Sequence, residues 1–146
     1  MRNMTEIPQY LEYGQCLAAG NTPGALRCLD ECIARVRAEQ DAQAAARLFQ
    51  YKGNLLYQTG DPAGAEASYQ SALDCAPDSP IVLMGYARFL ATTGAQPGAL
   101  DALTRLEAIL DRGWEPDSPG AYPAAALRER IAEIRAMLSD VTGVSV

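Results

Sequence analysis

The sequence predicts an all-α fold in which antiparallel helix hairpins repeat along the chain and stack on one another. Three segments of similar composition support this prediction, and each sets two glycines around turn-forming residues ahead of an amphipathic run. They are GNTPGAL beginning at Gly20, GDPAGAE beginning at Gly60 and GAQPGAL beginning at Gly94. The alanine that follows the second glycine recurs after 40 and then 34 residues. A period of this size is typical of stacked helical arrays.

The segment 46–79 shows the repeated unit most clearly. Phe49, Gly53 and Leu56 fall four and three residues apart, which places them on one face of a first helix. Because glycine has no side chain, Gly53 allows a neighbouring helix to approach this face closely. The pattern predicts a hairpin whose two helices touch at this glycine.

A turn and a second helix follow in the same segment. Gly60 suits the positive φ that ends many helices, Asp61 can accept backbone N–H groups as an N-cap, and Pro62 has the φ of a first helical turn. The second helix is expected to end before Pro77. Its inner face carries Ala65, Tyr69, Ala72 and Leu73.

These residues carry a family resemblance. The pattern consists of Phe49, Gly53, Leu56, Ala65, Tyr69, Ala72 and Pro77. It resembles the tetratricopeptide repeat (TPR), a pair of antiparallel helices about 34 residues long that combines large, small and aromatic residues in this order. Lys52 departs from the family pattern, which prefers Leu there. We expect that contact to be made by the lysine stem or by Tyr51 and Leu55 beside it.

Two further units keep the same frame. The unit 80–113 lacks the closing Pro but keeps Leu83, Ala87, Leu90, Gly94, Ala99, Leu103 and Leu106. The unit 8–40 is one residue short before its turn and keeps Tyr10, Gly14, Leu17, Gly20, Ala25, Leu29 and Cys32. It then runs six residues longer than the period, which indicates a longer second helix or a short linker near Gln40 and Asp41. The resemblance covers about residues 8–113 and implies a right-handed superhelix, an α-solenoid, with a concave face built from the first helices.

An amphipathic helix is predicted near the C-terminus, at about residues 121–139, after a Pro-rich connection. Its apolar side chains, Leu127, Ile131, Ile134 and Leu138, recur at steps of four, three and four residues. We interpret it as a capping helix that covers the exposed core of the last repeat. With 146 residues, the chain is expected to form one domain, 1–146.

Composition excludes several classes of partner. The net charge of −6 gives no general attraction to nucleic acid or to anionic membrane surfaces. The N-terminus lacks the apolar run of a signal peptide, and no apolar stretch is long enough for a membrane span. We therefore expect a cytoplasmic protein with reduced thiols and no membrane insertion. The Ala- and Arg-rich, Lys-poor composition favours a bacterial origin.

The chain contains no histidine, which removes Ser-His-Asp and Cys-His catalytic sites and imidazole zinc sites. The carboxylates fall at spacings that suit solvated helix faces. Cys16, Cys28 and Cys32 can come together in a hairpin, and a soft-metal or redox site is one interpretation. The simpler interpretation is that they pack as small apolar residues. We expect no enzymatic activity and no cofactor.

The resemblance implies a peptide-binding groove on the first helices. The places that line the concave face of such repeats fall on Arg47, Gln50, Asn54, Tyr57 and Gln58, and on Ile81, Met84, Arg88, Ala91 and Thr92. Asn54 can bond a peptide backbone, the guanidinium groups of Arg47 and Arg88 can hold carboxylates, and Tyr57 and Met84 offer apolar contacts. The alternative is that these are ordinary solvated side chains.

The sequence thus predicts an adaptor that binds a protein or peptide segment in the groove. A secretion chaperone for an export substrate and a self-assembling scaffold remain alternatives. In the second of these, Leu127, Ile131 and Ile134 would pack across a homodimer. Trp114 is either a secondary partner contact or a side chain that folds back over the last repeat.

Overall fold

The computed structural model describes residues 3–116 and 123–142, and all regular structure in these ranges is helical. A short 3₁₀ helix, η1, precedes seven α-helices. Their bounds are η1 Met4–Glu6, α1 Pro8–Ala18, α2 Thr22–Ala38, α3 Ala42–Gln58, α4 Pro62–Cys75, α5 Pro80–Thr92, α6 Gln96–Asp111 and α7 Ala124–Thr142. The predicted all-α fold of adjacent helix pairs is confirmed.

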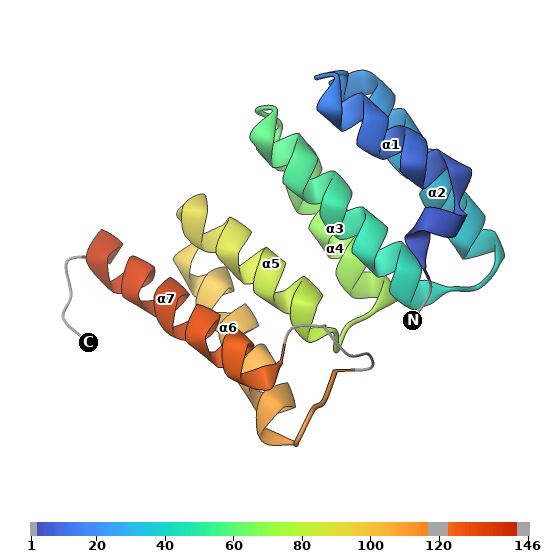
Figure 1. Cartoon of the computed structure of the whole chain (residues 1–146). Helices are drawn as coiled ribbons and strands as arrows, with labels where there is room; N and C mark the ends of the chain where they lie inside the picture. Colours follow the sequence, from blue (N-terminus) through green and yellow to red (C-terminus); the bar gives the residue numbers. More distant parts are fainter. Residues whose placement is uncertain (1–2, 117–122, 143–146) are drawn as a thin grey trace. The chain divides into compact units, whose positions relative to one another are not determined.

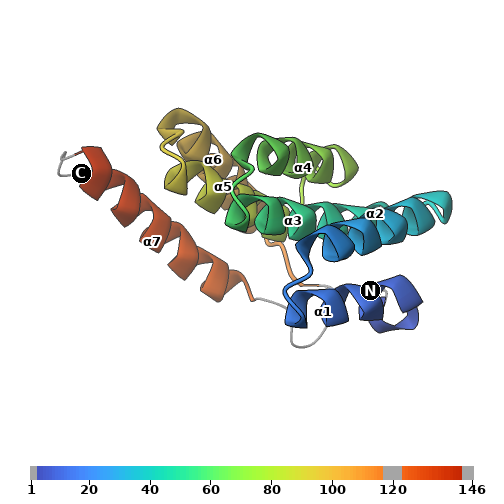
Figure 2. The ribbon, with the colours of Figure 1, turned by 90° about the horizontal axis from the view of Figure 1, so that it is seen from above.

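The chain divides into two compact units, Met1–Pro77 (unit 1) and Asp78–Val146 (unit 2). In unit 1, each helix packs against the next one along the chain, with α2 behind α1 and α4 behind α3 in Figure 1. Figure 2 shows the same unit from above, with α1 at one edge and α4 at the other. In unit 2, the three helices α5, α6 and α7 all pack against one another. The organisation as a single domain stays a prediction.

One kind of turn joins the helices at four places. At the turn after α3, Gly60 has a φ of +90°, and the N–H of Asp61 donates to the carbonyl of Leu56 at 2.9 Å, which closes α3. The side chain of Asp61 then accepts the N–H of Gly64 at 2.9 Å and caps α4. The other three turns have the corresponding residues at Gly20–Asn21, Gln40–Asp41 and Gly94–Ala95. One residue therefore ends a helix and begins the next.

In the first two of the three repeated segments, the second glycine lies beneath the capping side chain, whereas in the third Gly98 lies near Leu90 and the N-cap residue Ala95 has no capping side chain. A Cβ atom added at Gly24 or Gly64 would collide with the side chain of Asn21 or Asp61. Ala44 occupies the same place in the Gln40 turn and still donates its N–H to the capping carboxylate at 3.1 Å. The glycine therefore gives the cap room but is not required for it.

The first repeat is six residues longer than the period, and these extra residues lengthen the two helices α2 and α3. The sequence left open a longer second helix or a linker near Gln40. Helices α2 and α3 each have 17 residues, compared with 14 in α4 and 13 in α5. Helix α3 begins at Ala42, before the predicted start of the middle repeat at residue 46. The added length is thus helical, and the chain between the helices stays a tight turn.

The middle hairpin has the contact that the sequence predicted. A Cβ atom added at Gly53 on α3 would lie 3.0 Å from Cε2 of Tyr69 on α4, so the aromatic ring packs directly over the glycine. Lys52 is partly buried, and its Nζ lies 2.7 Å from a carboxylate oxygen of Asp30 on α2. Leu55 beside it is buried. Leu55 lies in the core of unit 1 and Tyr51 packs against it, so these two neighbours supply the apolar contact beside the place where the family prefers Leu.

The predicted register of the first helix is wrong. The sequence placed Gly14 and Leu17 at the contact within the first hairpin. A Cβ atom added at Gly14 would meet nothing within 4 Å, and Leu17 is 42% exposed. Counted back from the turn, Tyr13 and Cys16 hold the places that Gly53 and Leu56 hold in α3, and both pack against the core of unit 1. Matching the glycines, rather than the turns, shifted α1 by one residue.

The predicted amphipathic helix near the C-terminus is present as α7. Leu127, Ile131, Ile134 and Leu138 are all at most 4% exposed. Ion pairs join α7 to α6: the guanidinium of Arg128 lies 2.9 Å from Asp111, and Arg135 pairs with Glu107. Helix α7 thus covers the apolar side of the α5–α6 hairpin within unit 2. Residues 121 and 122 of the predicted range lie outside the described residues.

Candidate functional site

The five predicted contact residues of unit 1 run along one side of α3. Tyr57 and Gln58 are exposed, and Arg47 and Asn54 are partly buried. Gln50 is buried, with 8% of its surface exposed. This side of α3 therefore offers a ligand four side chains, while Gln50 lies in the interior.

Asn54 is held by the hairpin contact described above. Its Oδ1 accepts a hydrogen bond from the hydroxyl of Tyr69, a residue that is 3% exposed. Since the carbonyl oxygen is directed into the hairpin, the Nδ2 group is the part of the amide that can donate to a ligand. The sequence predicted Asn54 as a contact residue but did not predict this partner.

A cluster of three tyrosines, which the sequence analysis missed, joins α1 to α3. The ring centroids of Tyr10 and Tyr13 lie 5.8 Å apart, and those of Tyr10 and Tyr51 lie 6.5 Å apart. Burial raises the pKa of Tyr13 and of Tyr51, and the neighbouring Tyr10 raises both further. The charge of Arg47 acts in the opposite direction on Tyr51, which places the guanidinium close to this cluster.

The register of α1 extends the candidate site to that helix. Places that lie 40 residues before Asn54, Tyr57 and Gln58 are Gly14, Leu17 and Ala18. Leu17 is 42% exposed and Tyr57 is 37% exposed, so both helices present a large apolar side chain at the same place. An alignment anchored on the turns would have predicted this pair. We call the exposed and partly buried residues on this side of unit 1 the first-helix face; they are Gly14, Leu17, Arg47, Asn54, Tyr57 and Gln58.

The predicted contact residues of unit 2 lie on α5. Arg88 and Thr92 are exposed, and the Thr92 hydroxyl donates to the backbone carbonyl of Arg88 at 2.8 Å. Met84 is partly buried, Ile81 is 37% exposed, and Ala91 is buried. This side of α5 therefore presents one positive charge, from Arg88, and two apolar side chains, Ile81 and Met84.

Trp114 follows the end of α6 and is partly buried. The residues after Pro116, up to residue 122, lie outside the described residues. The role of Trp114 as a secondary contact stays a prediction.

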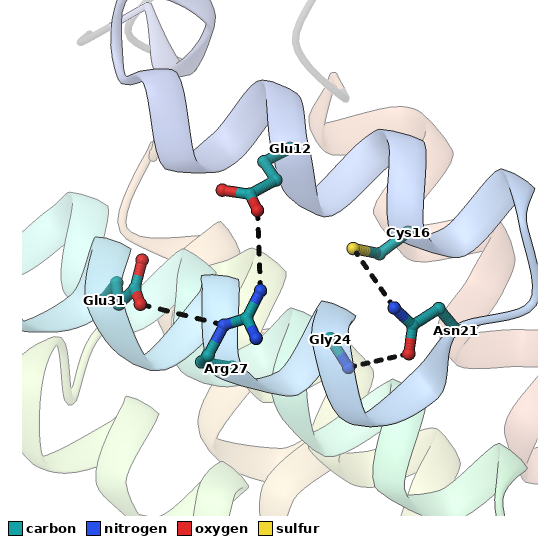
Figure 3. A network of polar contacts seen from close by, with 6 residues as sticks. All are labelled: Glu12, Cys16, Asn21, Gly24, Arg27 and Glu31. Carbon is teal, nitrogen blue, oxygen red and sulfur yellow. Dashed lines mark hydrogen bonds and ion pairs between the residues drawn. The ribbon is translucent and has the colours of Figure 1, made fainter.

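Of the three predicted thiols, Cys16 lies on α1, where Figure 3 shows its side chain near Asn21, and Cys28 and Cys32 lie on α2. Cys28 and Cys32 are fully buried, while Cys16 is partly buried and accepts a long hydrogen bond of 3.9 Å from Nδ2 of Asn21. Burial raises the pKa of the Cys28 thiol, with Glu12 as the next cause, and burial raises the pKa of Cys32 to about 11. Both buried thiols are therefore protonated at neutral pH, which makes them poor nucleophiles and poor metal ligands.

Exposed ion pairs surround the thiols. The guanidinium of Arg27 lies 3.5 Å from Glu12 on α1 and 3.9 Å from Glu31 on its own helix, as Figure 3 shows. Pairs of this kind are screened by solvent and contribute little to stability.

The described part of the chain contains neither a candidate metal centre nor a candidate membrane span. Within residues 3–116 and 123–142, no group of three or more Cys, Asp or Glu side chains is arranged to hold a metal ion. In the same ranges, no helix has the length and apolar character needed to cross a membrane.

Comparison with protein families supports the resemblance seen in the sequence. The family model of the tetratricopeptide repeat matches residues 17–80 and again residues 51–115. Comparison with curated proteins gave no match. The two family matches together extend over more than half of the chain and include the hairpin with Gly53 over Tyr69. The chain therefore belongs to the tetratricopeptide repeat family.

Proposed function

We propose that the protein is a non-enzymatic adaptor that binds a peptide or protein segment on the first-helix face of unit 1. Tetratricopeptide repeats generally mediate protein–protein interaction, so protein binding is the general function of the family. The observation that carries the proposal is that Leu17 on α1 and Tyr57 on α3 are exposed at equivalent places, with Tyr57 three residues after the fixed amide of Asn54. Exposed apolar side chains next to an oriented polar group are typical of peptide-binding surfaces.

Each group of the face has a chemical role in this proposal. Leu17 and Tyr57 would contact an apolar side chain of the ligand, and Nδ2 of Asn54 would donate to a backbone carbonyl. Because Tyr69 already fixes the amide, little conformational entropy is lost when the ligand binds it. Arg47, farther toward the start of α3, would contact an acidic group.

The exposed side of α5 is proposed as a second contact surface. Arg88 offers a charge-assisted hydrogen bond, and Met84 can adapt to different apolar side chains because it is long and unbranched. Thr92 lies one turn after Arg88 and would contribute its hydroxyl oxygen as an acceptor.

The state of the thiols supports a non-enzymatic role. The chain has no histidine to activate a cysteine nucleophile, and burial keeps the Cys28 and Cys32 thiols protonated at neutral pH. All four cysteines are free thiols, which suits a cytoplasmic location.

Self-association through α7 receives less support. Leu127, Ile131 and Ile134, which would form the dimer contact, are each buried within unit 2. Helix α7 would have to leave α5 and α6 before these side chains could contact a second copy.

Affinity capture from a lysate of the source cells tests the proposal. The bait is the full chain, and the variant combines Leu17→Ala, Asn54→Ala and Tyr57→Ala. A matched control replaces two exposed leucines elsewhere, Leu11→Ala and Leu100→Ala. We expect the control to keep a partner that the face variant loses, with equal helicity by circular dichroism.

Other outcomes would change the proposal. Equal capture by both variants would exclude the first-helix face, and a separate variant with Met84→Ala and Arg88→Ala would then test α5. A captured export substrate that is unfolded in the free state would favour the chaperone alternative over a general adaptor. A dimeric mass by light scattering, lost when α7 is mutated, would favour the scaffold.

A further inference from the structure

The thiols of Cys16 and Cys28 meet across the first hairpin. Cys16 is on α1 and Cys28 is on α2, and the neighbouring Cys16 is one of the groups that raise the pKa of Cys28, after its burial and Glu12. A Cβ atom added at Gly24, one turn before Cys28 on α2, would lie 3.0 Å from Sγ of Cys16. Figure 3 shows the Cys16 side chain directed from α1 toward α2. The contact at Gly24 places the Cys16 sulfur against α2, one helical turn before Cys28.

The two thiols differ in access to solvent. Cys16 is partly buried, whereas Cys28 has no exposed surface. A small oxidant in solution can therefore reach Cys16, while Cys28 is reached only through its neighbour. This combination of an accessible thiol with a second one beside it is typical of redox-responsive cysteines.

We propose that Cys16 and Cys28 form a peroxide-responsive pair that locks α1 onto α2 through an intramolecular disulfide. The inference does not depend on the proposed function. In a reducing compartment such a bond is transient, as is typical of cytosolic redox responses.

The chemistry requires only hydrogen peroxide as oxidant. The sulfur of Cys16 attacks one peroxide oxygen, an S–O bond forms as the O–O bond breaks, and water and a sulfenic acid result. Because burial keeps the Cys28 thiol protonated, it must first give up its proton to water. The Cys28 sulfur then attacks the adjacent Cys16 sulfur, an S–S bond forms as the S–O bond breaks, and the departing hydroxide takes up a proton to form a second water. One peroxide is reduced for each disulfide, and the chain loses two hydrogen atoms.

The bond would act on the helix of unit 1 that is held least firmly. No residue of α1 is buried. Its contacts with the core are made by partly buried side chains, Tyr10, Tyr13 and Cys16. Its ion pair from Glu12 to Arg27 is exposed and 3.5 Å long. Local opening is expected to begin in an element with so little buried surface. A covalent link to α2 would oppose that opening, and because α1 carries Leu17, it would also fix one half of the first-helix face.

Peptide mapping after oxidation tests the pair. The reduced full chain is treated with hydrogen peroxide, remaining thiols are alkylated, and the protein is digested with trypsin. Because Arg27 lies between the two cysteines, cleavage there separates them unless they are joined. We expect a linked pair of peptides containing Cys16 and Cys28, from a monomer two hydrogens lighter than the reduced chain.

Variants identify the second sulfur. Cys28 and Cys32 fall in one tryptic peptide, so the mapping is repeated with Cys32→Ala, which should keep the link, and with Cys28→Ala, which should lose it. Cys75→Ser is the control for a thiol outside the hairpin and should also keep it. Cys16→Ser changes a partly buried side chain and should fold, yet form no link.

Hydrogen exchange measures the locking. In the oxidised protein, the amides of α1 should exchange at least about tenfold more slowly, because the link removes open states of the helix. Exchange in α5, in the other unit, should not change and serves as the internal control. A link from Cys16 to Cys32 or Cys75, a link between two chains, or a Cys16 that oxidises to the sulfinic acid without any link would each overturn the proposal.

Discussion

The two hairpins of unit 1 have the same turns but different residues at the place where Gly53 meets Tyr69 in the second hairpin. In α3–α4, the first helix provides Gly53 and the second provides the ring of Tyr69. The places 40 residues earlier hold Tyr13 on α1 and Leu29 on α2, so the aromatic side chain comes from the first helix. The comparison teaches that the turn fixes the register of a hairpin, while the same place on the first helix can hold a glycine or a tyrosine.

The largest expected difference between the two hairpins is in how the free energy of unfolding depends on pH. It arises at a place on the second helix of each hairpin that holds a small residue. Cys32 in the first hairpin corresponds to Ala72 in the second. Burial raises the pKa of Cys32 from 9.0 to about 11, so the unfolded chain loses this proton first as the pH rises. The contribution of Cys32 to the free energy of unfolding should therefore be constant well below pH 9 and fall mainly between pH 9 and 11, by about 3 kcal/mol for a shift of this size.

The Cys32→Ala variant makes the first hairpin like the second at this place. Urea denaturation at several pH values should show a flatter decline for the variant than for the wild type. Tyr13 and Tyr51 also have raised pKa values, but both proteins contain them, so their effect cancels in the comparison. Equal slopes would show that Cys32 does not ionise differently in the folded and unfolded states.

Gly53→Ala should destabilise the protein by about 1–2 kcal/mol, since the new methyl group would overpack against a buried ring. The added Cβ would lie 3.0 Å from Cε2 of Tyr69, and the ring is 3% exposed and has little room to move. Chemical denaturation measures the change. An increase in stability would show that the Tyr69 ring can move enough to accommodate the added methyl group.

Tyr69→Phe should cost about 1 kcal/mol, the usual net value of a lost hydrogen bond. The variant keeps the ring over Gly53 but removes the hydroxyl that donates to Asn54. If Asn54 is oriented by this bond for ligand binding, the affinity for a captured partner should fall together with stability. If the variant binds the partner with wild-type affinity, the orientation of the Asn54 amide by Tyr69 is not needed for recognition.

Gly14→Ala should stabilise the protein by roughly 0.5–1 kcal/mol, because alanine has the better helix propensity and the new methyl group meets nothing. The same substitution thus has opposite expected signs at Gly14 and Gly53, and thermal unfolding of the two variants side by side checks this. If Gly14→Ala instead destabilised the protein, Gly14 would have to lie in the interior of the first hairpin, as the sequence analysis placed it.

Much of the fold could be predicted because turn residues act locally. Gly60 and Asp61 indicated where α3 ends and α4 begins, and the apolar spacing in residues 127–138 indicated α7. The register of α1 could not be predicted from the glycine pattern, because Gly14 matched the pattern in type but lies one residue away from the place equivalent to Gly53.

The candidate site was predicted in part. Exposure of Tyr57, Gln58, Arg88 and Thr92 agrees with surface positions, since all lie on the outer side of amphipathic helices. The burial of Gln50, the bond from Tyr69 to Asn54 and the tyrosine cluster depend on contacts between residues far apart in sequence. Periodicity within one helix contains no information on such contacts.

The turns at Gly20, Gln40 and Gly60 recur every 20 residues, and each uses its capping residue for two helices at once. A chain joined in this way has no spare residues between helices. One added residue would have to be absorbed inside a helix, where it rotates every later side chain by about 100°. Duplication of one 20-residue segment would reverse the direction of all that follows, whereas duplication of 40 residues would restore it. In this part of the molecule, evolution by insertion is therefore expected to proceed in whole hairpins.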